Sequence, residues 1–308
     1  MREAIFITGG TGLLALNWAA ARRERGAAVT LGLHERVVTL QGVAARRVTL
    51  DAVDAILRDL DEVQPQLVVH TAGMTNVEQC EADPALAAFV NVTIAANVAN
   101  ACARRGVGLV HISTDHLFRG DAALVSESEP VAPQNVYAAT KDEAERRVLD
   151  ANPDALVVRT NFYGWGPSYR PSFSDMIIRS LRRGAGVTLF QDVLYTPILV
   201  ETLSETVHDL VDAKARGIVH VVGDERISKH DFGVKIAKQF QLDAGLITPG
   251  LLADHPALVR RPFDMSLSNA HARRLLGRSA TGFGGIDAHL ARLHQQEQLG
   301  LARELQNL

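Results

Sequence analysis

The first 160 residues alternate short apolar runs with longer amphipathic or alanine-rich stretches, and this rhythm predicts repeated strand–helix units. The apolar runs predict strands at Ala4–Thr8, Ala28–Gly32, Arg47–Leu50, Leu67–Thr71, Gly108–Ser113 and Ala155–Arg159. The stretches between them predict helices at Leu13–Arg25, Asp51–Val63 (capped by Asp51), Pro84–Arg105 and Asn135–Asp150. This alternation is typical of an α/β fold of the Rossmann type, a doubly wound parallel sheet with helices on both faces.

The rhythm changes after Arg159. Residues 161–175 are rich in Gly, Pro and aromatic residues, which indicates a loop facing a ligand. Beyond them the pattern predicts helices at Ser174–Arg183, Val200–Ala213, Ser228–Phe240 and Ile286–Leu305, and short strands near Val187–Phe190 and Ile218–Val221. We therefore expect a sheet domain over residues 1–160 and a smaller C-terminal lobe over residues 161–308, with segments that return to the sheet.

The composition narrows the class of protein. The 308 residues are 47% hydrophobic and carry a net charge of −3, so nothing indicates binding to nucleic acid. Two cysteines, Cys80 and Cys102, lack metal-ligand spacing, which favours a reducing cytoplasm over a disulfide framework or a zinc site. The N-terminus leads directly into the first strand and no stretch reads as a membrane span, so we expect no signal peptide and no membrane partner.

The first strand ends in a glycine-rich turn that leads into a helix. In this position Gly9 permits a tight turn, and Gly12 lets backbone N–H groups approach the diphosphate of a dinucleotide at the helix N-terminus. The residues expected to contact this cofactor are Gly9, Thr11, Gly12, Leu13 and Leu14. The alternative is an ordinary glycine-rich turn between a strand and a helix.

The end of the second strand predicts which dinucleotide is bound. NAD enzymes usually place a carboxylate there for the ribose hydroxyl, but Gly32 and Leu33 carry none. His34 and Arg36 could pair with a 2′-phosphate, with Glu35 as a competitor; the alternative for all three is a solvated loop. The pattern favours NADP(H) over NAD(H).

A tyrosine and a lysine in the helix expected at residues 135–150 are the candidates for acid–base chemistry. Of the four tyrosines, only Tyr137 is followed by a lysine, Lys141, four residues on, which places both on one helix face. A nearby ammonium is expected to lower the pKa of the phenol and to suit it for proton transfer. Lys141 is also long enough to hold the ribose of a nicotinamide. The alternative is a surface pair.

A hydroxyl group follows the strand at residues 108–113. Thr114 stands where a parallel strand ends, and ligands bind at such ends. There it can donate a hydrogen bond to a carbonyl oxygen that gains negative charge as hydride arrives. The alternative is a polar residue that merely finishes the strand. Together with Tyr137 and Lys141, Thr114 predicts hydride transfer to a ketone.

These segments together resemble the extended short-chain dehydrogenase/reductase family, and within it the dTDP-4-dehydrorhamnose reductase branch. The resemblance spans nearly the whole chain. Its most specific block is HISTDHLFRG at residues 111–120 followed by NVYAATKDEAE at residues 135–145. The turn TGGTGLLA at residues 8–15, Arg159-Thr160 and Arg261-Pro262 also match.

The resemblance implies roles for particular residues. Thr114, Tyr137 and Lys141 would be the catalytic set. Asp51 would contact adenine, and Thr71, Ala72 and Gly73 would pass beneath the cofactor. Thr75, Val77, His116 and Phe162 would face the substrate, a sugar held by the C-terminal lobe.

The resemblance also implies an activity: NAD(P)H-dependent reduction of a ketone on a nucleotide-linked deoxy sugar. Related 4,6-dehydratases carry an Asp-Glu pair where this chain has Asp115-His116, so reduction fits better than dehydration. Asn17 replaces a carboxylate that some members use for a metal-bridged dimer, and we expect no metal. A non-catalytic regulatory subunit and a sugar-nucleotide epimerase are the alternatives, and a homo-oligomer stays open.

Overall fold

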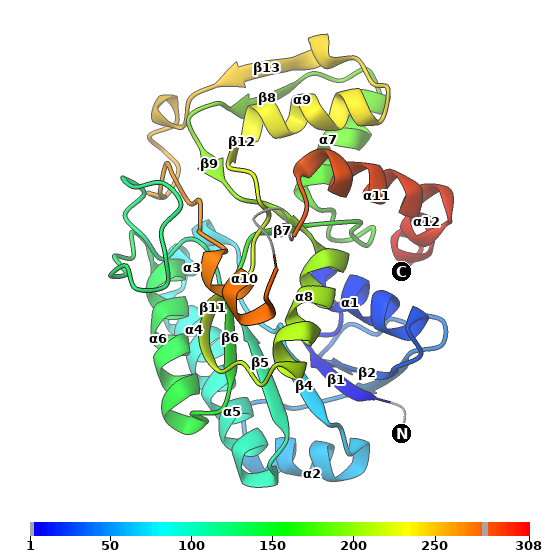
Figure 1. Ribbon diagram of the computed structural model, residues 1–308, viewed down its shortest axis with the longest axis vertical. Helices are drawn as coiled ribbons and strands as arrows, with labels where there is room; N and C mark the ends of the chain where they lie inside the picture. The colour runs from blue at the N-terminus through cyan, green and yellow to red at the C-terminus, as the bar shows by residue number, and fades with distance from the viewer. Residues whose placement is uncertain (1–2, 279–282) are drawn as a thin grey trace.

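The computed structural model describes residues 3–278 and 283–308, and its centre is a seven-stranded parallel sheet (Figure 1). The strand order is β11-β6-β5-β4-β1-β2-β3. The strands are β1 (Ala4–Thr8), β2 (Ala28–Leu33), β3 (Ala44–Arg47), β4 (Leu67–His70), β5 (Gly108–Ile112), β6 (Leu156–Arg159) and β11 (Gly217–His220). The order reverses between β1 and β4, and a reversal of this kind opens a crevice at the carboxyl ends of the strands. The predicted fold class is confirmed.

Helices cover both faces of the sheet because side chains alternate along each buried strand. Phe6 of β1 and Val157 of β6 pack under α2 (Val53–Val63), α5 (Ile94–Arg105) and α6 (Val136–Ala151). Ile5 and Ile7 point the other way, to a core shared with α1 (Leu13–Glu24) and α8 (Val200–Asp212).

The C-terminal half supplies a smaller lobe above the carboxyl ends of the strands (Figure 1). Its main elements are α7 (Phe173–Arg182), β8 (Val187–Phe190), α9 (Lys229–Gln239), β13 (Ile247–Gly250), α11 (Ile286–Gln298) and α12 (Leu301–Gln306). Short pairs join it to the sheet domain: β7 (Phe162–Tyr163) with β10 (Ile198–Leu199), and β9 (Leu194–Tyr195) with β12 (Ile227–Ser228). The helices α8 and α10 (Ala270–Leu276) and the strand β11 return to the sheet, while two 3₁₀ turns lie at Ala244–Leu246 and Leu252–Asp254.

Several elements differ from the sequence prediction. The third strand is Ala44–Arg47 rather than Arg47–Leu50; as an exposed edge strand it carries no apolar run. Asp51 does not cap α2, whose N-cap is Ala52 without a side-chain hydrogen bond. The helix expected at Ile286–Leu305 breaks at Gly300, where φ is +93°.

The stretch Pro84–Arg105 is helical throughout but not uniform. It comprises α4 (Pro84–Ala88), a π-helical turn at Phe89–Thr93 and α5, and a further short helix, α3 (Val77–Ala82), precedes it. Of the helices described, it is the one long and apolar enough to cross a membrane, which corrects the expectation that no stretch has these properties. Core helices pass the same test of length and composition, and α5 packs on α2, α6 and β5.

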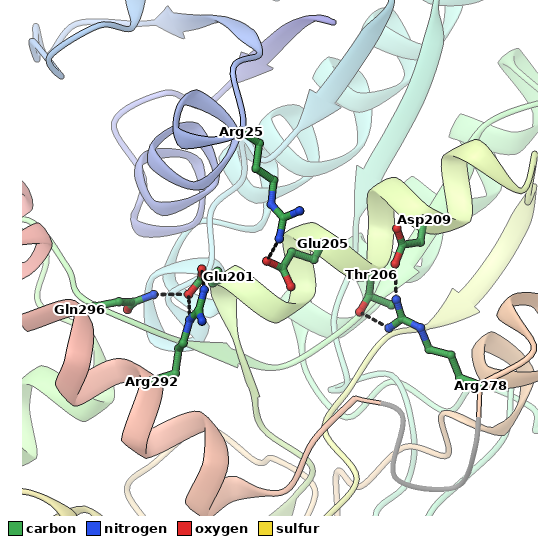
Figure 2. A network of polar contacts seen from close by, with 8 residues as sticks. All are labelled: Arg25, Glu201, Glu205, Thr206, Asp209, Arg278, Arg292 and Gln296. Carbon is green, nitrogen blue, oxygen red and sulfur yellow. Dashed lines mark hydrogen bonds and ion pairs between the residues drawn. The ribbon is translucent and has the colours of Figure 1, made fainter. Parts of the chain in front are cut away.

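One face of α8 forms ion pairs with three separate parts of the chain. Figure 2 shows three acidic residues spaced four apart along α8, each facing an arginine from another element. The pairs are Glu201 with Arg292 of α11, Glu205 with Arg25 beyond α1, and Asp209 with Arg278 beyond α10. Gln296 adds a hydrogen bond to Glu201 at 2.6 Å. These contacts join α8 to α11, to the end of α1 and to the segment after α10.

Candidate active site

The predicted catalytic residues come together at the carboxyl end of β5. Asn135 caps α6 by accepting a hydrogen bond from the Ala138 N–H at 2.9 Å, so the helix begins with Tyr137 in its first turn. Tyr137 and Lys141 project from the same helix face toward Thr114, which follows β5. All three side chains are buried, at 8%, 5% and 4% exposure, and all three line one cavity of about 320 Å³.

Lys141 is held by the end of β5. Its Nζ donates to the Ile112 carbonyl at 2.7 Å and lies 3.4 Å from Nε2 of His111. Burial lowers the pKa of Lys141 to about 8, and the nearby charge of Glu145 opposes part of that effect. His111 stacks on His70 at 5.4 Å, and burial holds the pKa of both imidazoles well below the ordinary value. Lys141 is therefore the cation beside two neutral rings.

The phenol of Tyr137 does not behave as the sequence predicted. Burial raises its pKa above the ordinary value, and a hydrogen bond with Thr114 opposes this effect only in part. The expected lowering of this pKa by Lys141 is wrong for this structure, because burial dominates and the nearby Asp115 also raises the pKa. Tyr137 is thus a protonated group at neutral pH, able to donate a proton.

A buried ion pair fixes α6 against the sheet. Glu145 lies one turn beyond Lys141 on the same face and pairs with Arg159 of β6; the side chains are 2% and 4% exposed. The guanidinium donates through Nη2 at 2.7 Å and through Nε at 3.0 Å, and Ser113 donates a further hydrogen bond to the same carboxylate. This pair sets the position of Tyr137 and Lys141 relative to Thr114.

The glycine turn approaches the segment after β4 too closely for a side chain at Gly9. Gly9 has a φ of +74°, and a Cβ there would lie 2.6 Å from the backbone nitrogen of Ala72. Gly12 is the N-cap of α1, and no side chain caps this helix. The first N–H groups of α1 therefore face a cleft and can bind an anion such as a diphosphate.

The cleft beside this turn has two halves. The first, of about 440 Å³, is lined by eight residues of the predicted cofactor set: Gly9, Thr11, Gly12, His34, Asp51, Thr71, Ala72 and Gly73. The second half, which we call the catalytic half, is the cavity of about 320 Å³ that contains the predicted catalytic residues. It shares Gly12, Thr71, Ala72 and Gly73 with the first half and adds Leu13 and Leu14. One continuous cleft thus runs from the end of β2 to Tyr137, and its narrow glycine cradle and open helix end fit a dinucleotide.

Other predicted residues lie in different surroundings. Arg36 does not line the cavity half beside Asp51; its guanidinium lies over the Tyr169 ring, 4.0 Å from the centroid. Thr75, His116 and Phe162 line the catalytic half. Val77 is buried in a small apolar cluster with Cys80, Ala87 and Tyr137.

Several residues of the site carried no recognisable signal in the sequence. Asn91 accepts a hydrogen bond from the Met74 N–H at 2.8 Å and donates to Thr140 Oγ1 at 3.0 Å, which ties the loop after β4 to α6. It lies in the π-helical turn, a feature that is frequent at functional sites but invisible to a helical pattern. Asn161 donates to the buried carboxylate of Asp115, and both line the catalytic half.

The described residues contain no group of three or more His, Cys, Asp or Glu side chains that could hold a metal ion. Asn17 instead has a structural role. Its amide donates to the Leu13 carbonyl at 2.8 Å and to the Trp165 carbonyl at 2.7 Å, so it joins α1 to the loop between β7 and α7.

Comparison with known proteins decides the family. The model for the RmlD substrate binding domain matches residues 1–290. The chain belongs to this family. The predicted resemblance to the extended short-chain dehydrogenase/reductases, in the dTDP-4-dehydrorhamnose reductase branch, is confirmed.

Several relatives of this RmlD family member are named as reductases. A probable low-salt glycan biosynthesis reductase from Haloferax volcanii is 32% identical over 88% of this chain and 92% of its own. A dTDP-4-dehydrorhamnose reductase from Mycobacterium tuberculosis is 32% identical over 71% of this chain and 72% of its own. The crystal structure of a dTDP-4-dehydrorhamnose reductase from Bacillus anthracis, in complex with NADP, has the same fold, with a TM-score of 0.83, 24% identity, and coverage of 96% of this chain and 100% of its own. These relatives agree with the predicted enzyme class, an NAD(P)-dependent oxidoreductase.

In this RmlD family member, Glu145→Gln is expected to lower the free energy of unfolding by about 3 kcal/mol, because it leaves the Arg159 guanidinium buried without a counter-charge. Chemical denaturation measures the change. Glu205→Gln, which breaks the more exposed pair with Arg25, is the matched control and should cost less than about 1 kcal/mol. An equal loss of unfolding free energy in the two variants would show that the Glu145–Arg159 pair stabilises the fold no more than an exposed pair does.

Proposed function

We propose that this protein reduces a ketone on a nucleotide-linked deoxy sugar with NAD(P)H. The observation that carries the proposal is the buried set of Thr114, Tyr137 and Lys141 on one cavity wall, continuous with a cleft that fits a dinucleotide. A bound nicotinamide would supply the hydride.

The chain's own groups would then handle the substrate oxygen. Thr114 donates a hydrogen bond to it, which stabilises the negative charge that develops on reduction. Tyr137, protonated at neutral pH and hydrogen-bonded to Thr114, gives the oxygen its proton. The cation of Lys141 lies where it can hold the cofactor ribose, and all three groups are largely shielded from bulk solvent.

The residues after Thr114 support reduction rather than water elimination. Asp115 is 2% exposed and accepts a hydrogen bond from Asn161, so it is a fixed carboxylate. Burial lowers the pKa of His116, despite the opposing effect of Asp115, so its ring is neutral. The ring lies edge-on to Tyr137 at 5.5 Å, where it can bind a sugar hydroxyl. Among the described residues that line this cavity, Asp115 is the one with a carboxyl group, so they offer no pair of carboxyl groups for elimination.

The regulatory-subunit alternative requires no turnover, and the epimerase alternative requires no net loss of reduced cofactor. We favour the reductase because the three predicted catalytic groups lie together in the cavity. The free thiols of Cys80 and Cys102, both buried, fit the cytoplasm as the place of action.

We propose NADP(H) as the preferred cofactor, because the end of β2 offers His34 rather than a carboxylate to the adenosine half of the cleft. Steady-state KM values for NADPH and NADH measure the preference. We expect the lower value for NADPH, and His34→Asp should shift the ratio toward NADH. A clear wild-type preference for NADH would contradict the assignment.

Tyr137→Phe is expected to reduce turnover by a factor on the order of 100 or more, because the phenylalanine cannot donate a proton. Binding of NADPH, followed by fluorescence, should change little. Wild-type turnover in this variant would remove Tyr137 from the mechanism, and absence of turnover in the wild-type protein would favour the regulatory subunit.

The pH profile should report Lys141. Its ammonium is the required form and its pKa is about 8, so kcat/KM is expected to be full below that pH and to fall above it. Lys141→Arg keeps the charge at every accessible pH and should move the falling limb upward. An unmoved limb would assign the titration to another group.

A further inference from the structure

The chain between β7 and α7 forms a short closed loop beside the cofactor cleft, residues 166–172, which we call the strap. The buried carboxylate of Asp175 joins its two ends by accepting hydrogen bonds from the N–H groups of Gly166 at 2.6 Å and Ser172 at 2.9 Å. Inside the strap the Arg170 N–H donates to the Pro167 carbonyl at 3.0 Å. A Cβ at residue 166 would lie 2.5 Å from the Arg170 carbonyl oxygen, so this closure requires glycine. The strap is therefore a pre-organised turn.

Two side chains of the strap reach across to the sheet domain. The Tyr169 hydroxyl donates to the Thr11 carbonyl in the glycine turn at 2.8 Å. Arg170 donates to the Thr75 hydroxyl, in the loop after β4, at 2.8 Å. Arg170 also lines both halves of the cleft, beside Gly12 and Gly73. The strap thus bridges the two segments between which a dinucleotide would pass.

Among the described residues, the guanidinium groups of Arg36 and Arg170 have no carboxylate partner. Arg36 lies over the Tyr169 ring at 4.0 Å, and within residues 3–278 and 283–308 neither Arg36 nor Arg170 forms an ion pair with a carboxylate. Many other arginines of the chain do form such pairs. A guanidinium group without a counter-charge in a cleft, as Arg170 is, suits the binding of phosphate. The open N-terminus of α1 lines the same cavity and also favours an anion.

We propose that Arg170 is a phosphate-binding residue, held by the strap over the diphosphate of the bound NAD(P)H. This inference rests on the proposed function, which supplies the dinucleotide. The diphosphate of a nucleotide sugar offers the same chemistry. The cofactor is favoured because the strap is fixed to the glycine turn itself, through the bond from Tyr169 to Thr11, and Thr11 lines the cofactor half of the cleft and not the other half. Through its bond to Thr75, the same residue links cofactor binding to the loop predicted to face the substrate.

Equilibrium titration of the full-length protein with four probes tests the proposal. NADPH and ADP-ribose carry the cofactor diphosphate, 2′-AMP lacks it, and dTDP stands for the substrate carrier. Arg170→Met keeps the aliphatic part of the side chain and should raise the Kd for NADPH and ADP-ribose about 10-fold, the effect of losing one charge-assisted hydrogen bond. The Kd values for 2′-AMP and dTDP should change less than about twofold.

Two further variants control the result. Arg170→Lys keeps the charge without the planar fork and should recover part of the affinity. Arg216 is an exposed arginine that lies beyond α8 and pairs with Asp154. The variant Arg216→Met should bind every probe as the wild-type protein does. The dependence of the NADPH Kd on salt should be weaker in Arg170→Met than in either control, because one ionic contact is lost.

Three outcomes would overturn the proposal while leaving the proposed function in place. They are an unchanged Kd for NADPH in Arg170→Met, a loss confined to dTDP, and an equal loss for 2′-AMP and NADPH. Failure of the wild-type protein to bind NADPH or NADH at all would instead contradict the proposed function itself.

Discussion

The arrangement of the active site depends on a buried ion pair between α6 and the sheet. Glu145 and Arg159 are almost fully buried, and removing two charges from water is costly unless they are paired and hydrogen-bonded. The multiple contacts of the guanidinium and the hydroxyl of Ser113 meet that condition. Tyr137, Lys141 and Glu145 recur every four residues along one helix face. The ion pair of Glu145 therefore fixes the position of the Tyr137 phenol and the Lys141 amine relative to the end of β5.

The second constraint on the site is the close approach of two chain segments where the strand order reverses, between β1 and β4. The turn after β1 and the segment after β4 approach so closely that Gly9 has no room for a side chain. This contact leaves the first turn of α1 open to a ligand. The cleft then continues to the catalytic cavity along the carboxyl ends of β4 and β5, so the sheet topology alone brings a dinucleotide site next to Thr114.

The structural features that could be predicted from the sequence are those that depend on strong local patterns. The buried strands, the helix at residues 136–151 and the glycine turn follow from apolar periodicity and backbone permissiveness, and the structure has all three. The edge strand Ala44–Arg47 could not be predicted because its exposed side chains carry no apolar signal. The raised pKa of Tyr137 was missed because it depends mainly on burial, which is a tertiary property. Arg170 and Asn91 escaped for the same reason: only folding brings them to the cleft.

Direct observation of the reaction tests the central claim, that the Thr114, Tyr137 and Lys141 set serves the reduction of a keto-sugar. The measurement follows the absorbance of NADPH after mixing the protein with a dTDP-linked 4-keto-6-deoxy sugar, while the product is quantified separately. The account predicts one NADPH oxidised for each alcohol formed. Conversion of the sugar without loss of reduced cofactor, or no conversion of any nucleotide-linked ketone, would contradict it.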